Sequence, residues 1–106
     1  MAIRAPRLDQ LPTWDEKGVL HVVVESPRGS GVKLKYEPDL EAMTLSRPLP
    51  LGLVFPFEFG FVPRTKAEDG DPLDAIVLLD AGTFPGVVLR CRPIALVRVS
   101  QKGATR

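Results

Sequence analysis

The chain has 106 residues with 14 basic and 13 acidic side chains, so its formal net charge is +1, and neither sign forms a long run. This length allows one small domain, and the balanced charge argues against a nucleic-acid partner or a membrane surface. Cys91 is the single cysteine and cannot form an internal disulfide, and no apolar stretch is long enough for a signal peptide or a membrane span. We therefore expect a cytoplasmic protein that binds neither nucleic acid nor membrane.

Strand-forming segments follow one another along the chain, separated by glycine and proline. Eleven prolines and nine glycines interrupt the sequence too often for long helices. We predict strands at 19–26, 32–37 and 44–47, with a turn over 27–31; a helix-like patch at 38–43 is explained equally well by a turn. An aromatic strand at 54–62, an apolar strand at 75–79 and a strand at 87–100, broken near Pro93, complete the prediction. The fold class is all-β, a small barrel or sandwich.

The first two strands carry charged residues at alternating positions. In 32–37 the apolar residues share one face, while Lys33, Lys35 and Glu37 share the other, because side chains alternate along a strand. If 19–26 pairs with this strand as a hairpin, Glu25 joins Lys35 and Glu37 on one polar surface. Such a surface is either part of a binding site or an ordinary solvent-exposed face.

Four phenylalanines alternate within the aromatic segment, at positions 55, 57, 59 and 61. A stripe of this kind could stack nucleobases, as some oligonucleotide-binding barrels do. No basic residue lies between the rings until Arg64, so a stripe that faces the core is the better interpretation.

The most informative motif is Asp69-Gly70-Asp71-Pro72-Leu73-Asp74, which an apolar run follows. Gly70 and Pro72 favour a turn, so the three carboxylates lie on a loop next to a buried strand. Two carboxylates about 4 Å apart repel by roughly 4 kcal/mol at an effective dielectric near 20, so three require either bulk water or a divalent cation. An EF-hand loop is excluded because its sixth position would be Asp74 rather than glycine. A solvated acidic turn and a metal site both remain possible from the residues alone.

With this motif the chain resembles the soluble, Mg²⁺-dependent (family I) inorganic pyrophosphatases. The other matching segments occur in the family's order: V-V-V-E at 22–25, K-Y-E at 35–37, an arginine at 47, F-P-F-E-F-G-F at 55–61 and R-C-R-P-I at 90–94. The resemblance implies an all-β, OB-like barrel without long helices. It implies one domain over 1–106, with an N-terminal extension at 1–18 and the barrel strands at 19–100.

The resemblance also implies a role for each site residue and Mg²⁺-dependent hydrolysis of pyrophosphate to two phosphates. Asp69, Asp71 and Asp74 would belong to the Mg²⁺ site, with Asp74 touching two ions, and Asp71 would orient and deprotonate the attacking water that bridges them. Lys35 and Arg47 would bind phosphate oxygens. Glu37 would hold a further metal through water, and Glu25 would organise the hydrogen bonds of the site.

Two departures from the family pattern motivate an alternative. Phe59 stands where the family has a phosphate-binding tyrosine, and Gln101 stands about where a metal-binding aspartate is expected. The family's later acids and lysines have no counterpart before Arg106, which predicts a barrel incomplete at its C-terminal end and a homo-oligomer that covers the open edge. The alternative is a relative that binds metal or phosphate ligands without efficient turnover.

Overall fold

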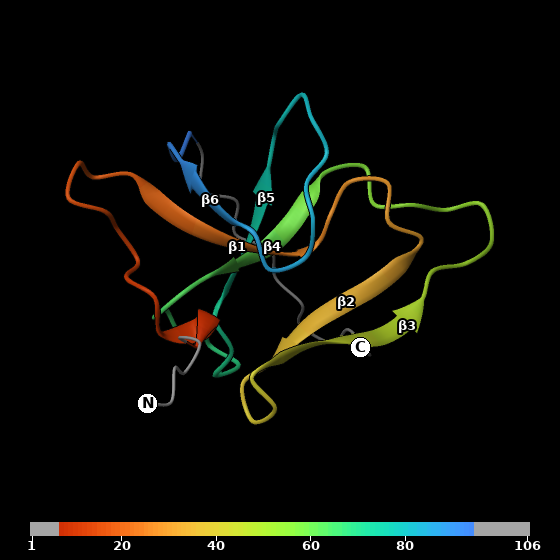
Figure 1. Ribbon diagram of the computed structural model, residues 1–106, viewed down its shortest axis with the longest axis horizontal. Coiled ribbons are helices and arrows are strands. Elements are labelled where there is room, and N and C mark those ends of the chain that lie inside the picture. Colours follow the sequence, from red (N-terminus) through yellow and green to blue (C-terminus); the bar gives the residue numbers. More distant parts are fainter. Residues whose placement is uncertain (1–6, 95–106) are drawn as a thin grey trace, which may run out of the picture.

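The structure, a computed structural model, describes residues 7–94, and nearly all of its regular elements are strands (Figure 1). A 3₁₀ helix, η1, at Leu8–Gln10 is the only helical element in the described part. Six strands follow: β1 Leu20–Ser26, β2 Val32–Glu37, β3 Ala42–Pro48, β4 Glu58–Val62, β5 Leu73–Val77 and β6 Val88–Cys91. The predicted all-β class without long helices is confirmed.

The strands form two antiparallel sheets. One has four strands in the order β5-β4-β1-β6, and the other is the β2-β3 hairpin, which lies beside it in Figure 1. The inner faces of the sheets meet at Tyr36 and Phe61, whose rings stack with their centroids 5.9 Å apart. Val23 of β1 completes the core, and Leu8, Leu11 and Met43 pack against it. Burial of such side chains stabilises each by about 1.5–3 kcal/mol.

Strands β1 and β2 do not form the hairpin that the sequence suggested, because the turn between them carries the chain from one sheet to the other. Instead, two side chains of β1 accept hydrogen bonds from the backbone of β2. The Ser26 hydroxyl accepts the Leu34 N–H at 3.0 Å, and the Glu25 carboxylate accepts the Tyr36 N–H at 2.8 Å. Buried backbone donors must find an acceptor, and here side chains replace the missing ladder.

The predicted strand bounds are confirmed for β2, and β1 and β6 begin one residue later than expected. Residues 38–41 form a turn, so β3 begins at Ala42 rather than residue 44. The aromatic segment is only half strand: β4 begins at Glu58, after Pro56, which has no N–H for a ladder. The apolar strand lies two residues earlier than predicted and includes Asp74. Residues 95–100 of the last predicted strand lie outside the described part.

Candidate active site

The acidic motif begins in the loop between β4 and β5, where Asp69 and Asp71 lie as predicted, but its third carboxylate, Asp74, lies within β5 rather than on the loop. Asp69 accepts the N–H of Asp71 on Oδ1 at 3.0 Å, and Gly70 adopts a φ of 90°, which glycine tolerates without strain. The Asp71 carbonyl accepts the Ala67 N–H at 2.6 Å, and the Leu73 N–H is bound by the Thr65 hydroxyl at 2.9 Å. Backbone hydrogen bonds thus order the loop and leave the Asp69 and Asp71 carboxylates exposed to solvent.

Asp74 lies at the second position of β5, opposite Phe61 of β4, so the sheet itself fixes its place. Partial loss of hydration raises the pKa of Asp74, and the negative charges of Asp69 and then Asp71 raise it further, while Lys33 opposes the shift. All three motif carboxylates therefore interact electrostatically, and the positive charge that partly balances them comes from the other sheet.

Glu25 is the buried member of the site. Burial raises its pKa, and the charge of Asp74 adds to the rise; the hydrogen bond from Tyr36 and the charges of Lys35 and Lys33 lower it. Glu25 is thus influenced both by Asp74 of the acidic motif and by the basic residues of β2, and it is hydrogen-bonded to the β2 backbone at Tyr36. Its predicted part in the hydrogen bonding of the site is compatible with this position.

Lys33 is a residue to which the family resemblance assigned no role in the site. It is half-buried, its charge acts on both Glu25 and Asp74, and it lies opposite Arg47 in the β2-β3 ladder. Lys35, the residue chosen from the K-Y-E segment, is exposed, lies opposite Thr44, and influences Glu25. Charges alternate along 32–37, so both lysines were predicted to lie on one face of the strand. The cross-strand register distinguishes them, because Lys33 lies opposite Arg47 and Lys35 lies opposite Thr44.

Glu37 ends β2 opposite Ala42, and among residues 7–94 no hydrogen bond or ion pair joins its side chain to the residues above. In the same part of the chain no three histidine, cysteine or acidic side chains converge closely enough to hold a metal ion. The donor chemistry does fit a hard cation, since carboxylate oxygens are what Mg²⁺ binds. Desolvation is the largest cause of the raised pKa of Asp74, and the negative charges of Asp69 and Asp71 add to it.

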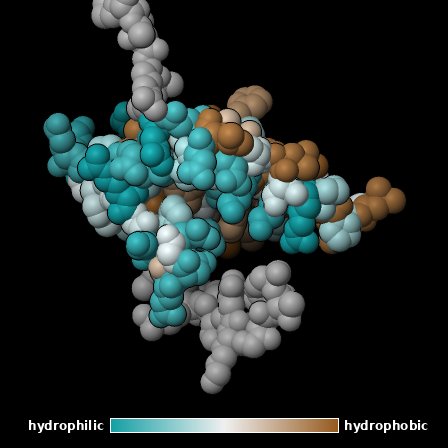
Figure 2. Space-filling view, turned by 90° about the horizontal axis from the view of Figure 1, so that it is seen from below, coloured by the Kyte–Doolittle hydropathy of each residue, from teal (hydrophilic) through white to brown (hydrophobic). Residues whose placement is uncertain are grey.

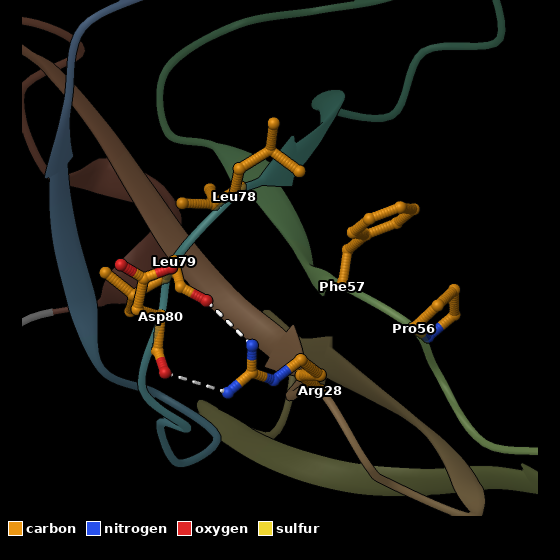
Figure 3. Close-up of a pocket in the computed structure, with 7 residues that line it drawn as sticks. Arg28, Pro56, Phe57, Leu78, Leu79 and Asp80 are labelled. Atoms are coloured by element: carbon orange, nitrogen blue, oxygen red, sulfur yellow. Dashed lines mark hydrogen bonds between the residues drawn. The ribbon is translucent and has the colours of Figure 1, made fainter.

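A second buried carboxylate, Glu58, lies outside the predicted site and is 1% exposed. It accepts the backbone N–H of Arg28 at 2.8 Å and the hydroxyl of Thr83. The guanidinium of Arg28 in turn donates to the carbonyls of Leu79 at 2.8 Å and Asp80 at 3.3 Å (Figure 3). These contacts tie the β1–β2 turn to the segment after β5.

The open pocket in Figure 3 is lined in part by Arg28, Leu79 and Asp80 of this anchor and not by the predicted site. None of the acidic-motif residues borders it, and Phe57 and Leu78 form much of its apolar side. Glu58 alternates with the phenylalanines and therefore lies on the opposite face of β4. If the phenylalanines face the core, alternation predicts an exposed Glu58, so the sequence carried no signal for its burial.

Comparison with known proteins now adds to this geometry. Residues 22–105 match the sequence profile of the family described as inorganic pyrophosphatase. The chain belongs to this family. The match includes most of β1, all of β2 to β6 and the acidic motif, so the pyrophosphatase resemblance inferred from short motifs is confirmed over most of the chain.

Individual pyrophosphatases are similar to this chain in sequence and in fold. An inorganic pyrophosphatase of Nostoc is 41% identical over 96 residues, covering 91% of this chain and 57% of the relative. One of Thermus thermophilus is 48% identical over 91 residues, covering 85% and 52%. A crystal structure of inorganic pyrophosphatase from Thermus thermophilus superposes with a TM-score of 0.74 and 50% identity, over 78% of this chain and 48% of that one.

The chain therefore spans about half the length of the curated relatives it matches. Superposition on solved pyrophosphatases confirms the OB-like fold. No helix in residues 7–94 is long and apolar enough to cross a membrane. Gln101, one of the two departures from the family pattern, lies outside the described residues.

Proposed function

We propose that this protein hydrolyses inorganic pyrophosphate to two phosphates in a Mg²⁺-dependent reaction. The observation that carries the proposal is an acidic motif on an ordered loop in a chain whose β2-β3 hairpin pairs two cations, Lys33 and Arg47. The charge of Lys33 also counteracts the rise in the pKa of Asp74, which is compatible with a shared site. Family membership supports the same reaction, since the relatives are named inorganic pyrophosphatases.

Positive charge for the substrate would come from the hairpin. Pyrophosphate carries several negative charges, which repel an incoming nucleophile. Lys33 and Arg47 lie opposite one another, so their charges can bind oxygens of one ligand, and Lys35 is the neighbouring cation on the same strand. Charge-assisted hydrogen bonds of this kind are about twice as strong as neutral ones.

The acidic motif would provide the metal ligands and the base. Asp69 and Asp74 would hold Mg²⁺, and Glu37 would hold a further ion through water; bound Mg²⁺ neutralises phosphate charge and lowers the pKa of water. Asp71, exposed on a hydrogen-bonded loop, would accept the proton of the attacking water. The water oxygen bonds to one phosphorus, the P–O bond to the bridging oxygen breaks, and two phosphates leave. Positioning and electrostatics suffice for such a transfer.

Phosphate release from pyrophosphate at millimolar Mg²⁺ tests the proposal. Asp71→Asn should lower the rate about 100-fold or more, the range lost with a general base. Glu68→Gln removes the same charge from the same exposed loop and should stay within about twofold, as expected for an exposed charge outside the motif. Equal rates for the two variants would refute the role of Asp71. Saturable phosphate or Mg²⁺ binding without turnover in the wild-type protein would favour the alternative of an impaired relative.

The cellular location of the protein and its assembly into a homo-oligomer are also predictions from the sequence. We propose a cytoplasmic location, which the single cysteine supports. A homo-oligomer was predicted from an open sheet edge. Sedimentation of the purified protein over a range of concentrations would test the assembly.

A further inference from the structure

The hydroxyl group of Thr65 closes the base of the loop that carries Asp69 and Asp71. It donates a hydrogen bond to the carbonyl of Val62 at 2.6 Å and accepts the N–H of Leu73 at 2.9 Å. Val62 and Leu73 are the last pair of the β4-β5 ladder, and residues 66–72 lie beyond them. We call these two hydrogen bonds of Thr65 the hydroxyl clamp.

The hydroxyl clamp lies next to all three carboxylates of the acidic motif. Asp74 directly follows Leu73 in β5, and Asp69 and Asp71 lie on the loop that the clamp closes. Hydrogen bonds also join the Ala67 N–H to the Asp71 carbonyl and the Asp71 N–H to the Asp69 carboxylate. These two bonds lie wholly within the tip of the loop, so they shape the tip without fixing its place relative to Asp74. The clamp at the base of the loop fixes that place.

The bend that delivers the hydroxyl clamp is held by the N-terminal segment. Arg64, directly before the clamp residue, has a φ of 55°, in the left-handed region that residues other than glycine rarely adopt. Its N–H donates to the carbonyl of Asp9 at 3.1 Å and its Nε to the carbonyl of Gln10 at 2.8 Å. The hydroxyl of Thr13 donates to the carbonyl of the buried Pro63 at 2.8 Å. A backbone conformation of this kind persists where its surroundings determine it, and here η1, beside the loop in Figure 1, belongs to those surroundings.

The hydroxyl clamp lies near the surface rather than in the core. Leu73 is 43% exposed and Thr65 is half-buried, so water can replace the hydroxyl as the acceptor of the Leu73 N–H. Figure 2 views the molecule from below and shows mainly hydrophilic residues on its left side. A hydrogen bond that water can replace adds little to the stability of a fold. The consequence of the clamp is therefore expected in the geometry of the acidic loop.

We propose that Thr65 is a positioning residue for the metal-binding carboxylates of the acidic motif. Its hydroxyl holds the loop with Asp69 and Asp71 at a fixed place relative to Asp74, so that Mg²⁺ gathers the three carboxylates with little further ordering of the chain. Groups that orient metal ligands from outside typically contribute about 10- to 100-fold to metal affinity. The inference rests on the proposed function, because it assumes that the acidic motif binds metal, but it does not require turnover.

Mg²⁺ alone, titrated into the ¹⁵N-labelled 106-residue chain, tests the inference through the NMR shifts of the Gly70 and Asp71 N–H groups. Thr65→Val keeps the branched shape but removes the hydroxyl, so the Mg²⁺ dissociation constant should rise about tenfold and the Leu73 N–H should exchange faster with solvent. Thr65→Ser retains a hydroxyl and should restore both values. Thr44→Val is the matched control, because Thr44 is also half-buried and its hydroxyl donates to a backbone carbonyl, that of Lys35, at 3.2 Å. It should bind Mg²⁺ as the wild type does.

The outcomes distinguish a positioning role from a purely structural one. All three variants should keep the circular dichroism of the wild type, because both hydroxyl groups lie near the surface. Weaker Mg²⁺ binding in Thr65→Val, restored in Thr65→Ser, supports the proposal. Faster exchange of the Leu73 N–H with unchanged Mg²⁺ affinity would overturn it, and so would a wild-type protein that binds no Mg²⁺. Failure of the proposed function is seen separately, as Mg²⁺ binding without phosphate release, and the Thr65 comparison decides the inference in that case too.

Discussion

Gly60 is the position at which the smallest change should have the largest effect on this fold. It lies in β4 opposite Val24 of the buried central strand β1, and it is itself buried. A Cβ added there would lie 1.9 Å from the carbonyl oxygen of Val23, 2.8 Å from its carbonyl carbon and 3.0 Å from Cα of Val24. All three atoms belong to the backbone, so no side chain can rotate away.

The magnitude follows from this contact. The Cβ of Gly60→Ala would have to recede by about 1.5 Å, from 1.9 Å to the 3.4 Å at which ordinary contact begins, and a close-packed interior permits this only if β4 moves away from β1. Overpacking costs about 1–3 kcal/mol, and each ladder hydrogen bond lost beside Gly60 costs about 1 kcal/mol. We expect a loss of about 4 kcal/mol, a large part of the roughly 5–15 kcal/mol that a small domain has.

Thermal unfolding followed by circular dichroism measures this loss. At about 4–8 °C per kcal/mol for a domain of this size, Gly60→Ala should lower Tm by roughly 15–30 °C. Gly82→Ala is the control, because nothing lies within 4 Å of its added Cβ and its φ is not in the left-handed region; it should change stability by no more than about 0.5 kcal/mol. If Gly60→Ala melts within a few degrees of Gly82→Ala, the close pairing of β4 with β1 is wrong.

Three further substitutions test the site and its supports. Glu25→Gln should stabilise the protein near pH 8 but not near pH 4: burial raises the folded-state pKa, so the contribution of Glu25 is complete below its ordinary value of 4.5 and is lost as pH rises through the folded value. Urea unfolding at both pH values measures this, and a difference that is constant with pH would contradict it. Glu58→Ala should cost about 3 kcal/mol in the same assay, because it leaves the Arg28 N–H and the Thr83 hydroxyl without their acceptor; a loss under about 1 kcal/mol would show that water replaces the carboxylate. Lys33→Ala should weaken phosphate binding in calorimetry about tenfold, as expected for one charge-assisted hydrogen bond, and more than Lys35→Ala does; the reverse order would contradict the assignment from strand register.

Local chemistry in the sequence was enough to predict much of the fold. Alternating β-branched and charged residues marked β1 and β2, and frequent glycine and proline excluded long helices, because these preferences act within a few residues. Gly70 in the acidic motif identified a turn that adopts a positive φ. The motif itself, with the segments around it, was specific enough to indicate the family that the comparisons confirm.

Errors in the prediction arose where a segment's partner is distant in sequence. The 27–31 turn looked like a hairpin turn, but it carries the chain between sheets, and nothing in its own residues distinguishes the two outcomes. The shift of β5 toward Asp74 has the same origin. Pairing with β4 sets where that strand begins, and Phe61 lies opposite Asp74 only once β4 is in place.

The sequence by itself determined which residues could do chemistry, because carboxylates, lysines and arginines carry their charge and donor type wherever they lie. It also determined which segments are strands and where the acidic loop turns. Only the tertiary structure decided that Lys33 lies opposite Arg47, that Glu58 is buried as an anchor, and that Gly60 touches β1. The reason is that cross-strand register and sheet membership depend on contacts between residues tens of positions apart, which no local preference encodes.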